Sequence, residues 1–244
     1  MQMVTLFTGS GSSFKAMPAP AFYKYGRRVH IDGLLELGGI RVGTLHDFRR
    51  MELGIGISDP DEGKKRVSHE MGFMRVRKPG EVTALNTQDA SAPFAFEFFP
   101  PEASFVSVSG IRFHKEFDTP NHYVYCFSDT LSHSTMLEFE GANSCVAITN
   151  PTEFLHGITR EIMKQTAVVS VGLCQVTYSA REENWTGQDW GGNPISLKLP
   201  KYQGQHEWRA VWKPISDESI EPILIGTSEL GAYCKHVTVP LPIN

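Results

Sequence analysis

The sequence has no apolar run of about 18 residues, the length that a membrane-spanning helix needs. Residues 1–15 lack the basic and apolar regions of a secretory signal. Positive charge is not in excess, because 23 Lys and Arg face 27 Asp and Glu, for a net charge of −4. The chain as a whole therefore has no field that favours nucleic acid, although a local basic groove stays open. We expect a protein without a membrane partner.

Paired cysteines are also missing. The four cysteines are widely spaced, and no two are separated by only two residues. Neither a disulfide framework nor a cysteine-based zinc site is indicated. This usage is typical of reduced, buried thiols in a cytoplasmic protein.

One polar segment, 52–66, raises the question of a metal site. Glu52, Asp59, Asp61 and Glu62 could bind a divalent cation, but Pro60 interrupts them and the spacing matches no full calcium loop. A solvated loop is the favoured interpretation. With His46, the same acids would form a metal-dependent nuclease, which is kept as an alternative.

The remaining pattern is dominated by short β-strands rich in aromatic and β-branched residues. They are expected at 22–25, 40–42, 72–77, 94–99, 105–108, 111–117, 122–128, 144–149, 168–178, 221–225 and 237–241. The strand at 122–128 is almost continuously apolar, which predicts a central position. A short helix at 31–37 should end at Gly38 and Gly39.

The clearest helix begins at Pro151, with Asn150 as its N-cap. Its apolar stripe comprises Phe154, Leu155, Ile158, Ile162 and Met163, and is expected to be core. Together these elements predict an α+β fold of mostly antiparallel twisted sheets with a few short helices. We expect an N-terminal arm over 1–21 and a single domain over 22–244.

A late stretch, Lys201–Trp212, reads as an exposed approach followed by a strand. Alternation would place Gln205, Glu207 and Arg209 on one face and Trp208 on the other. A Gln-x-Glu pair at the start of a late strand is the arrangement that ADP-ribosyltransferases use. A plain Glu–Arg pair on an edge strand would give the same pattern.

Several segments resemble an uncharacterised bacterial domain family found near phage-defence genes. The resemblance rests on Tyr23-Lys24-Tyr25, on Cys126-Phe127-Ser128 followed by Met136-Leu137, and on Glu207-Trp208-Arg209. The family's helix usually reads Met-Trp and is followed by an aromatic residue and His. This chain has Leu137 and lacks that His.

The same layout is similar to ADP-ribosyltransferases, including nucleic-acid-modifying toxins of toxin–antitoxin systems. The resemblance implies NAD as a substrate, no metal, and Glu207, Arg49 and Gln205 as catalytic residues. Lys24 stands where these enzymes usually have His or Arg, and whether Lys24 or Tyr25 faces NAD is open. The implied NAD-binding residues are Tyr23, Lys24, Tyr25, Arg41, His46, Phe127, Ser128 and Arg209.

The chemistry calls for these residue types. A carboxylate stabilises the oxocarbenium-like ribosyl group as nicotinamide leaves. An Arg fork neutralises pyrophosphate, and an aromatic face stacks on nicotinamide. Trp185 and Trp190, in the polar loop 180–204, are the expected contacts to the acceptor.

The sequence thus predicts an NAD-dependent mono-ADP-ribosyltransferase, a bacterial toxin or phage-defence effector. Its acceptor would be a macromolecule, with RNA favoured over DNA or protein, and an antitoxin could be its partner. The alternatives are a non-catalytic binding module of a defence system and the metal-dependent nuclease.

Overall fold

The computed structural model describes residues 3–4, 17–18, 21–50, 58–77, 81–83, 105–185 and 193–241. These residues gather into two compact units, where the sequence predicted one domain after the arm. Unit 1 takes residues 1–64, 118–180 and 192–244, and unit 2 takes 65–117 and 181–191. The fold is α+β with mostly antiparallel sheets and few helices, so the coarse class predicted from the sequence is confirmed.

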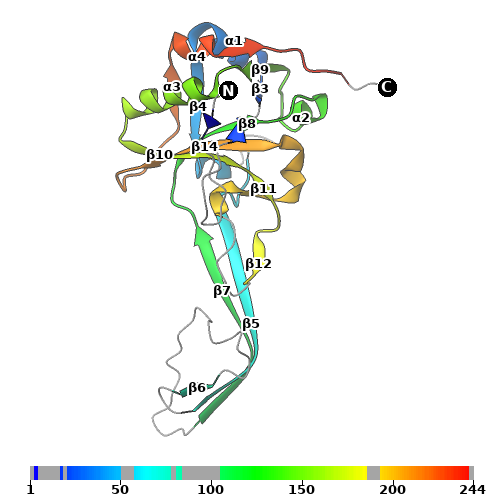
Figure 1. Cartoon of the computed structure of the whole chain (residues 1–244), viewed down its shortest axis with the longest axis vertical. Helices are drawn as coiled ribbons and strands as arrows, with labels where there is room; N and C mark the ends of the chain where they lie inside the picture. Colours follow the sequence, from blue (N-terminus) through cyan, green and yellow to red (C-terminus); the bar gives the residue numbers. More distant parts are fainter. Residues whose placement is uncertain are drawn as a thin grey trace. The chain divides into compact units, whose positions relative to one another are not determined.

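Unit 1 is built on an eight-stranded sheet (Figure 1). Its main path runs β10 (Val168–Gln175), β14 (Glu207–Pro214), β8 (Tyr123–Ser128), β3 (Phe22–Gly26), β9 (Ser144–Ile148) and β16 (Cys234–His236). Off this path, β4 (Gly39–Thr44) pairs with both β8 and β15 (Ile223–Gly226). Every pair in this sheet is antiparallel. The predicted central position of residues 122–128 is confirmed.

Strand β8 is the place where the sheet forks. Along one edge it pairs with β14 over its whole length, from Tyr123 opposite Trp212 to Ser128 opposite Glu207. On the other edge, its first two residues pair with β4 and its last residue pairs with Tyr23 of β3. Among the described strands, neither β3 nor β4 forms a ladder with residues 125–127. The fork therefore leaves the middle of β8 facing a gap between two diverging strands.

Helix α1 (Arg28–Leu37) links the two arms of the fork. It ends at Gly38, whose φ of 63° lies in the left-handed region, as the predicted glycine stop requires. Helix α4 (Ser228–Ala232) packs against α1. Helix α2 (His133–Leu137) follows β8 and is capped by the Ser132 side chain, which accepts from Thr135 N.

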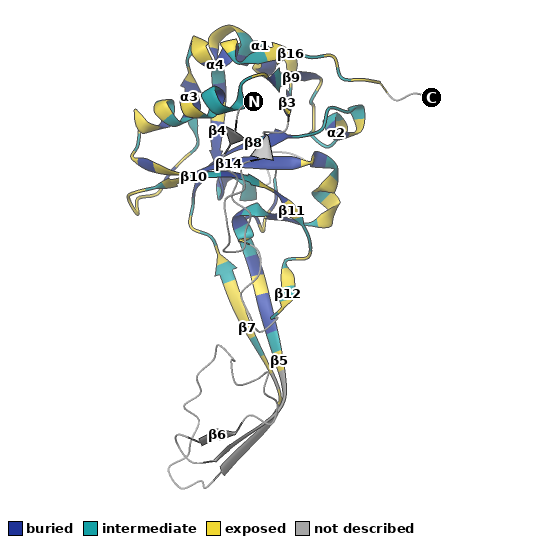
Figure 2. Ribbon diagram, viewed as in Figure 1, coloured by how far each residue is buried: buried dark blue, intermediate teal, exposed yellow. Residues whose placement is uncertain are grey.

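Helix α3 (Pro151–Met163) has the predicted start, because the Asn150 side chain accepts from Glu153 N with Pro151 in the first turn. It covers the face of β14 that carries Trp208, Ala210 and Trp212, and Trp212 donates its indole N–H to Thr159 at 2.8 Å. Strands β8 and β14 are buried along most of their length (Figure 2).

Four predictions about elements are corrected. Met163, placed in the core, is 59% exposed because it falls on the open side of the last helical turn. The strand expected over 168–178 divides into β10 and β11 (Thr177–Tyr178), which pairs in parallel with β13 (Leu197–Lys198). Residues 237–241 form no strand; β16 lies just before them. The two strands expected over 105–117 form one strand, β7 (Phe105–Asp118), and the expected strand 94–99 lies outside the described residues.

The remaining elements are short or belong to unit 2. In unit 1, β1 (Met3–Val4) pairs with β2 (Met17–Pro18), and the described residues include the 3-10 turns η1 (Asp47–Arg49), η4 (Pro194–Ser196) and η5 (Pro200–Gln205). In unit 2, β5 (Lys64–Arg77) pairs with β7, with β6 (Glu81–Thr83) and with β12 (Glu182–Asn184).

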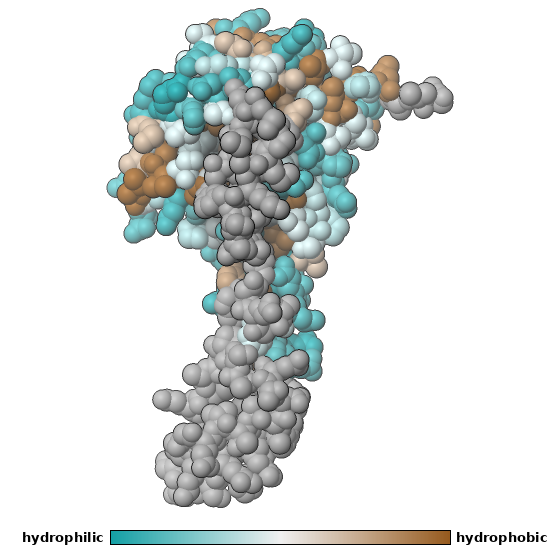
Figure 3. All heavy atoms as spheres, viewed as in Figure 1, coloured by the Kyte–Doolittle hydropathy of each residue, from teal (hydrophilic) through white to brown (hydrophobic). Residues whose placement is uncertain are grey.

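On the face that Figure 3 shows, the described residues are mainly hydrophilic, with apolar groups in separate places. Exposed large apolar side chains include Val29 on α1 and Leu224 on β15, at 68% and 77% exposure. In the described part of the chain, no helix has the length and apolar character that crossing a membrane requires.

Candidate functional site

The fork in the sheet of unit 1 opens into a cleft of about 810 Å³. Its lining comes from β3 and α1 on one side, β4 on the other, and the middle of β8 together with β13 and β14. The volume falls within the range of roughly 300–1,000 Å³ that is usual for small-ligand sites. The fork cleft is therefore the candidate site of this protein.

Most of the site residues predicted from the sequence line this cleft. Those present are Tyr23, Lys24, Tyr25, Arg41, Phe127, Ser128, Glu207 and Arg209. Gln205, His46 and Arg49 do not line it, although all three belong to unit 1. Residues from segments more than 180 positions apart thus meet at one cavity.

Glu207 is 3% exposed and is held by two cations. Its Oε2 accepts from Lys198 Nζ at 2.5 Å, and its Oε1 accepts from Arg209 Nε at 2.6 Å. Burial alone would raise the pKa of Glu207, but the charges of Arg209 and Lys198 outweigh it and lower that pKa to about 2. Glu207 is consequently a carboxylate anion at any physiological pH.

Arg209 is 1% exposed and donates hydrogen bonds to oxygens of Glu207, Glu62 and Ile195. Its Nη1 and Nη2 donate to the two oxygens of Glu62 at 2.8 and 3.0 Å, and Nη1 also donates to the Ile195 carbonyl at 2.6 Å. Burial opposes the charge of Arg209, but Glu207 and Glu62 raise its pKa well above the ordinary value. Residues 209 and 207 share a face of β14, as predicted, yet that face is buried.

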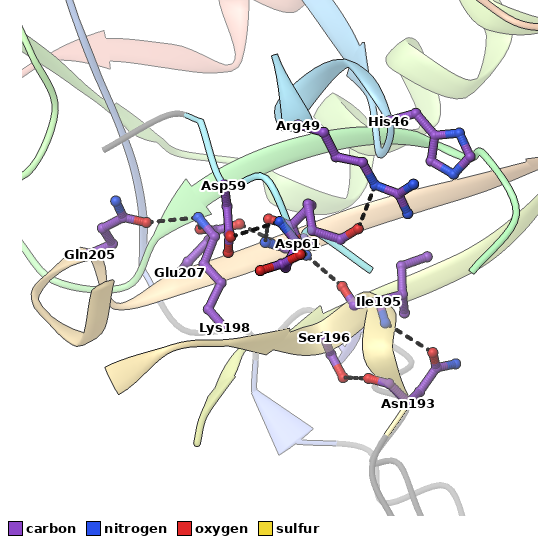
Figure 4. Close-up of polar contacts among 12 residues, drawn as sticks. His46, Arg49, Asp59, Asp61, Asn193, Ile195, Ser196, Lys198, Gln205 and Glu207 are labelled. Carbon is purple, nitrogen blue, oxygen red and sulfur yellow. Dashed lines mark hydrogen bonds and ion pairs between the residues drawn. The ribbon is translucent and has the colours of Figure 1, made fainter. Parts of the chain in front are cut away.

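Lys198 joins Glu207 to Gln205. Its Nζ donates to Gln205 Oε1 at 2.9 Å as well as to Glu207, and all three side chains are buried (Figure 4). Gln205 ends the 3-10 turn η5, and the strand starts only at Glu207, because His206 between them has φ 47°. Gln205 therefore contacts the carboxylate through Lys198, whereas the sequence placed it beside Glu207 on one strand.

Arg49 and His46 are held outside the cleft lining by contacts of their own. Arg49 donates to the Glu62 carbonyl from Nε at 2.8 Å and pairs with Asp118 through Nη2 at 2.5 Å. His46 Nε2 lies 3.0 Å from the Thr119 carbonyl. Arg49 thus supports the backbone next to Glu62, which in turn holds Arg209.

Lys24 occupies the gap at the fork. Its Nζ donates to the carbonyl of Cys126 at 2.9 Å and lies 4.6 Å from the centre of the Tyr125 ring. Cys126 is one of the β8 residues that neither arm of the fork pairs, so Lys24 satisfies a carbonyl that the diverging strands leave open. Burial lowers the pKa of the Lys24 ammonium and raises the pKa of the Cys126 thiol to about 12.

Aromatic rings form another part of the wall. Tyr25 stacks against Phe139 with ring centres 5.9 Å apart and planes 19° apart. Its hydroxyl donates to the Thr130 carbonyl at 2.7 Å and accepts from Ser132 N at 3.0 Å, so it fixes the segment that leads into α2. Phe127 packs on Phe22 in the core.

The charge of the lining is mainly positive. Arg27, at the start of α1, is exposed and has no ion pair among the described residues. Arg41 pairs with the buried Asp47 at 2.5 Å. In all, five basic side chains line the cleft against two acidic ones: Lys24, Arg27, Arg41, Lys198 and Arg209, against Glu140 and Glu207. Such a cleft attracts an anionic ligand even though the whole chain is acidic.

In the described part of the acidic segment, residues 58–66, the structure differs from the solvated loop that the sequence predicted. Glu62 is fully buried and accepts from Arg209. Asp59 is 2% exposed, and its side chain accepts from Asp61 N in the turn beside Glu62. Asp61 Oδ1 lies 3.9 Å from Lys64 Nζ. Across the described residues, no three His, Cys, Asp or Glu side chains are grouped so as to hold a metal ion, and Glu52 lies outside them.

The predicted acceptor contacts are in a different part of the chain. Trp185 lies in unit 2, where its ring meets His69 edge-on with centres 4.8 Å apart and its backbone N–H donates to the Ser68 carbonyl. Trp190 lies outside the described residues. Their assignment to the acceptor stays a prediction.

Sequence reasoning missed Lys198, Glu62 and Arg27. Lys198 gave no usable signal, because a lone Lys in a polar loop is usually solvated. Glu62 was noted only as a metal ligand, and Arg27 is one of two neighbouring arginines that the sequence does not distinguish.

In comparisons with known protein families, with curated proteins and with solved structures, nothing matches this chain.

Proposed function

We propose that this protein is an NAD-dependent ADP-ribosyltransferase and that NAD lies in the fork cleft. The observation that supports this most is that one cleft of about 810 Å³ gathers a buried carboxylate, aromatic rings and an excess of cations. NAD is an anionic dinucleotide with two aromatic rings, and its reactive carbon becomes positive when nicotinamide leaves. Each of these features meets a complementary group in the lining.

Glu207 would hold a ribose hydroxyl and stabilise the developing positive charge. A carboxylate has about four acceptor positions, and the contacts with Lys198 and Arg209 use two of them. Its low pKa keeps it ionised, as this role requires. Lys198 and Arg209 fix the direction of its oxygens, so little reorganisation would accompany the reaction.

Arg27 and Arg41 are suited to the pyrophosphate, because both line the cleft and both retain exposed guanidinium groups. Tyr25, Phe139 and Tyr23 supply faces for the rings of the dinucleotide.

The first test is titration calorimetry with NAD on the full chain. Arg27→Ala removes a cleft cation that has no ion pair among the described residues, so we expect NAD affinity to fall by about tenfold. The matched control is Arg28→Ala, because the next residue is equally exposed, pairs with Asp32 and does not line the cleft. An absence of NAD binding up to millimolar concentration contradicts the proposal.

The acceptor is proposed to be a macromolecule, with RNA favoured over DNA and protein, as expected of a toxin or phage-defence effector. Radiolabelled NAD incubated with separate pools of RNA, DNA and protein distinguishes these classes. Trp185→Ala is expected to remove transfer to the acceptor while NAD binding persists. Growth arrest on expression, relieved by a dedicated partner protein, would identify an antitoxin.

A second candidate is a non-catalytic nucleotide-binding module. It is favoured by one observation: both oxygens of Glu207 contact cations of the protein, as those of a purely structural carboxylate would. This candidate predicts that NAD or another nucleotide binds without being consumed. Chromatography of NAD and free nicotinamide after incubation separates the two functions.

A further inference from the structure

A transfer reaction in this cleft needs a group that accepts a proton. The acceptor attacks through a hydroxyl or amino group, and its hydrogen must leave as the new bond to the ribose forms. Glu207 is poorly suited, because Lys198 and Arg209 already donate to its two oxygens and hold its pKa near 2. A carboxylate that binds protons so weakly stabilises charge but takes up little of the acceptor's proton.

Lys24 is the contrasting group in the same cleft. Both Lys24 and Lys198 line the cavity, but Lys198 is paired with a carboxylate and Lys24 is not. Among the described residues, the Lys24 amine has one hydrogen bond, to the Cys126 carbonyl, and lies over the Tyr125 ring. An enclosed ammonium with no carboxylate partner is disfavoured relative to the neutral amine.

The charged and titratable groups that act on Lys24 come from three neighbouring strands. Cys126 of β8 and Glu207 of β14 favour its protonated form, whereas burial and Lys198 of β13 favour the neutral form. Burial is the largest of these effects, and the pKa of Lys24 is lowered. His30 also lines the cleft, and it is exposed, which makes it the rival base.

We propose that the amine of Lys24 takes the proton from the acceptor, while Glu207 remains an ionised carboxylate throughout. This inference rests on the proposed transferase function. The bond between C1′ of the ribose and nicotinamide breaks, and its electron pair leaves with nicotinamide, which departs neutral. A lone pair on the acceptor atom X forms the new bond to C1′, and the electrons of the X–H bond stay on X as the proton moves to Lys24 Nζ and then to water.

The first experiment needs no activity. The full chain is acetylated with trace acetic anhydride at a series of pH values, and the reactivity of each lysine is read by mass spectrometry. Lys24 should become reactive at a lower pH than the exposed Lys164. A Lys24 that titrates together with Lys164 overturns the proposal. So does a Lys24 that never reacts, because a base that an acceptor can reach must also be open to a small reagent.

The second experiment measures the pH dependence of NAD turnover with acceptor. The arginine of Lys24→Arg carries a cation and N–H donors but cannot act as a base. We expect NAD turnover to fall about a hundredfold and its pH profile to lose the acid limb. Lys24→Met, which approximates the length of the side chain, serves as the second variant, and melting temperatures identify any variant that fails to fold. His30→Gln should keep the acid limb.

Unchanged turnover and an unchanged acid limb in a folded Lys24 variant overturn the proposal, as does loss of the limb in His30→Gln alone. If the wild-type chain consumes no NAD, the transferase function fails, whereas the labelling experiment still decides whether Lys24 is a free amine in the cleft.

Discussion

Arg209 and Glu62 form a two-bond guanidinium–carboxylate pair although 147 positions separate them in the chain. Glu207 and Lys198 extend the pair into a buried row of two carboxylates and two cations. The formal charges of these four groups cancel, which makes their common burial tolerable. The wall of the cleft behind Glu207 therefore depends on Glu62, a residue that does not line the cleft itself.

Removing Glu62 should be costly. Glu62→Ala leaves two buried cations, Arg209 and Lys198, with Glu207 as the one remaining carboxylate of the row. We therefore expect the unfolding free energy to fall by about 3–5 kcal/mol. The control is Glu229→Ala, which breaks the exposed pair with Arg160 and should cost at most about 1 kcal/mol. Urea unfolding curves measure both. Equal losses for the two variants would contradict a buried pair at Arg209.

Glu207→Gln separates the proposed chemistry from folding. The isostere keeps the volume but removes the charge, so we expect NAD turnover to fall about a hundredfold or more. For a solvent-accessible Glu, this substitution would change the unfolding free energy by less than about 1 kcal/mol. Because Glu207 is 3% exposed and holds two cations, that condition is not met, and the melting temperature should fall as well. Full turnover in a folded variant removes Glu207 from the mechanism.

Stability should fall in acid through Glu207. The folded protein lowers the pKa of this group from 4.5 to about 2, so the unfolded chain binds its proton first. The stability that Glu207 contributes is present above pH 4.5 and is lost as the pH falls toward about 2. Unfolding free energies measured across this window should decline less steeply in Glu207→Gln than in the wild type. Parallel slopes would show that Glu207 is not held by its cations in solution.

Two glycines of α1 should respond in opposite ways to alanine. Gly38 has φ 63°, and a Cβ there would lie 1.7 Å from the carbonyl oxygen of Thr227, so Gly38→Ala should cost about 2 kcal/mol or more. Gly33 lies within the helix, and a Cβ there meets nothing within 4 Å, so Gly33→Ala should stabilise by about 0.5–1 kcal/mol. Thermal unfolding of both variants provides the check, and a destabilised Gly33→Ala would contradict the open space at that position.

Local signals were sufficient for several elements. Asn150 and Pro151 fixed the start of α3, and Gly38 fixed the end of α1, because capping and left-handed backbone depend on neighbouring residues only. The near-continuous apolar character of 122–128 predicted a strand buried on both faces, and β8 has that place. The sequence could not predict that β8 would pair with β3 at one end and β4 at the other, since nothing local distinguishes a fork from a continuous ladder.

The sequence alone assigned Tyr23, Lys24 and Glu207 to short strands and made them candidate site residues. It also determined that Gln205, Glu207 and Arg209 are close along the chain. Tertiary structure decided which of them share a cavity. It placed Lys198 between Gln205 and Glu207, paired Arg209 with Glu62, and kept Arg49 out of the cleft lining. The physical reason is that a buried charge must find its partner wherever the fold supplies one, and the partners of Arg209 and Glu207 come from segments whose sequences give no sign of each other.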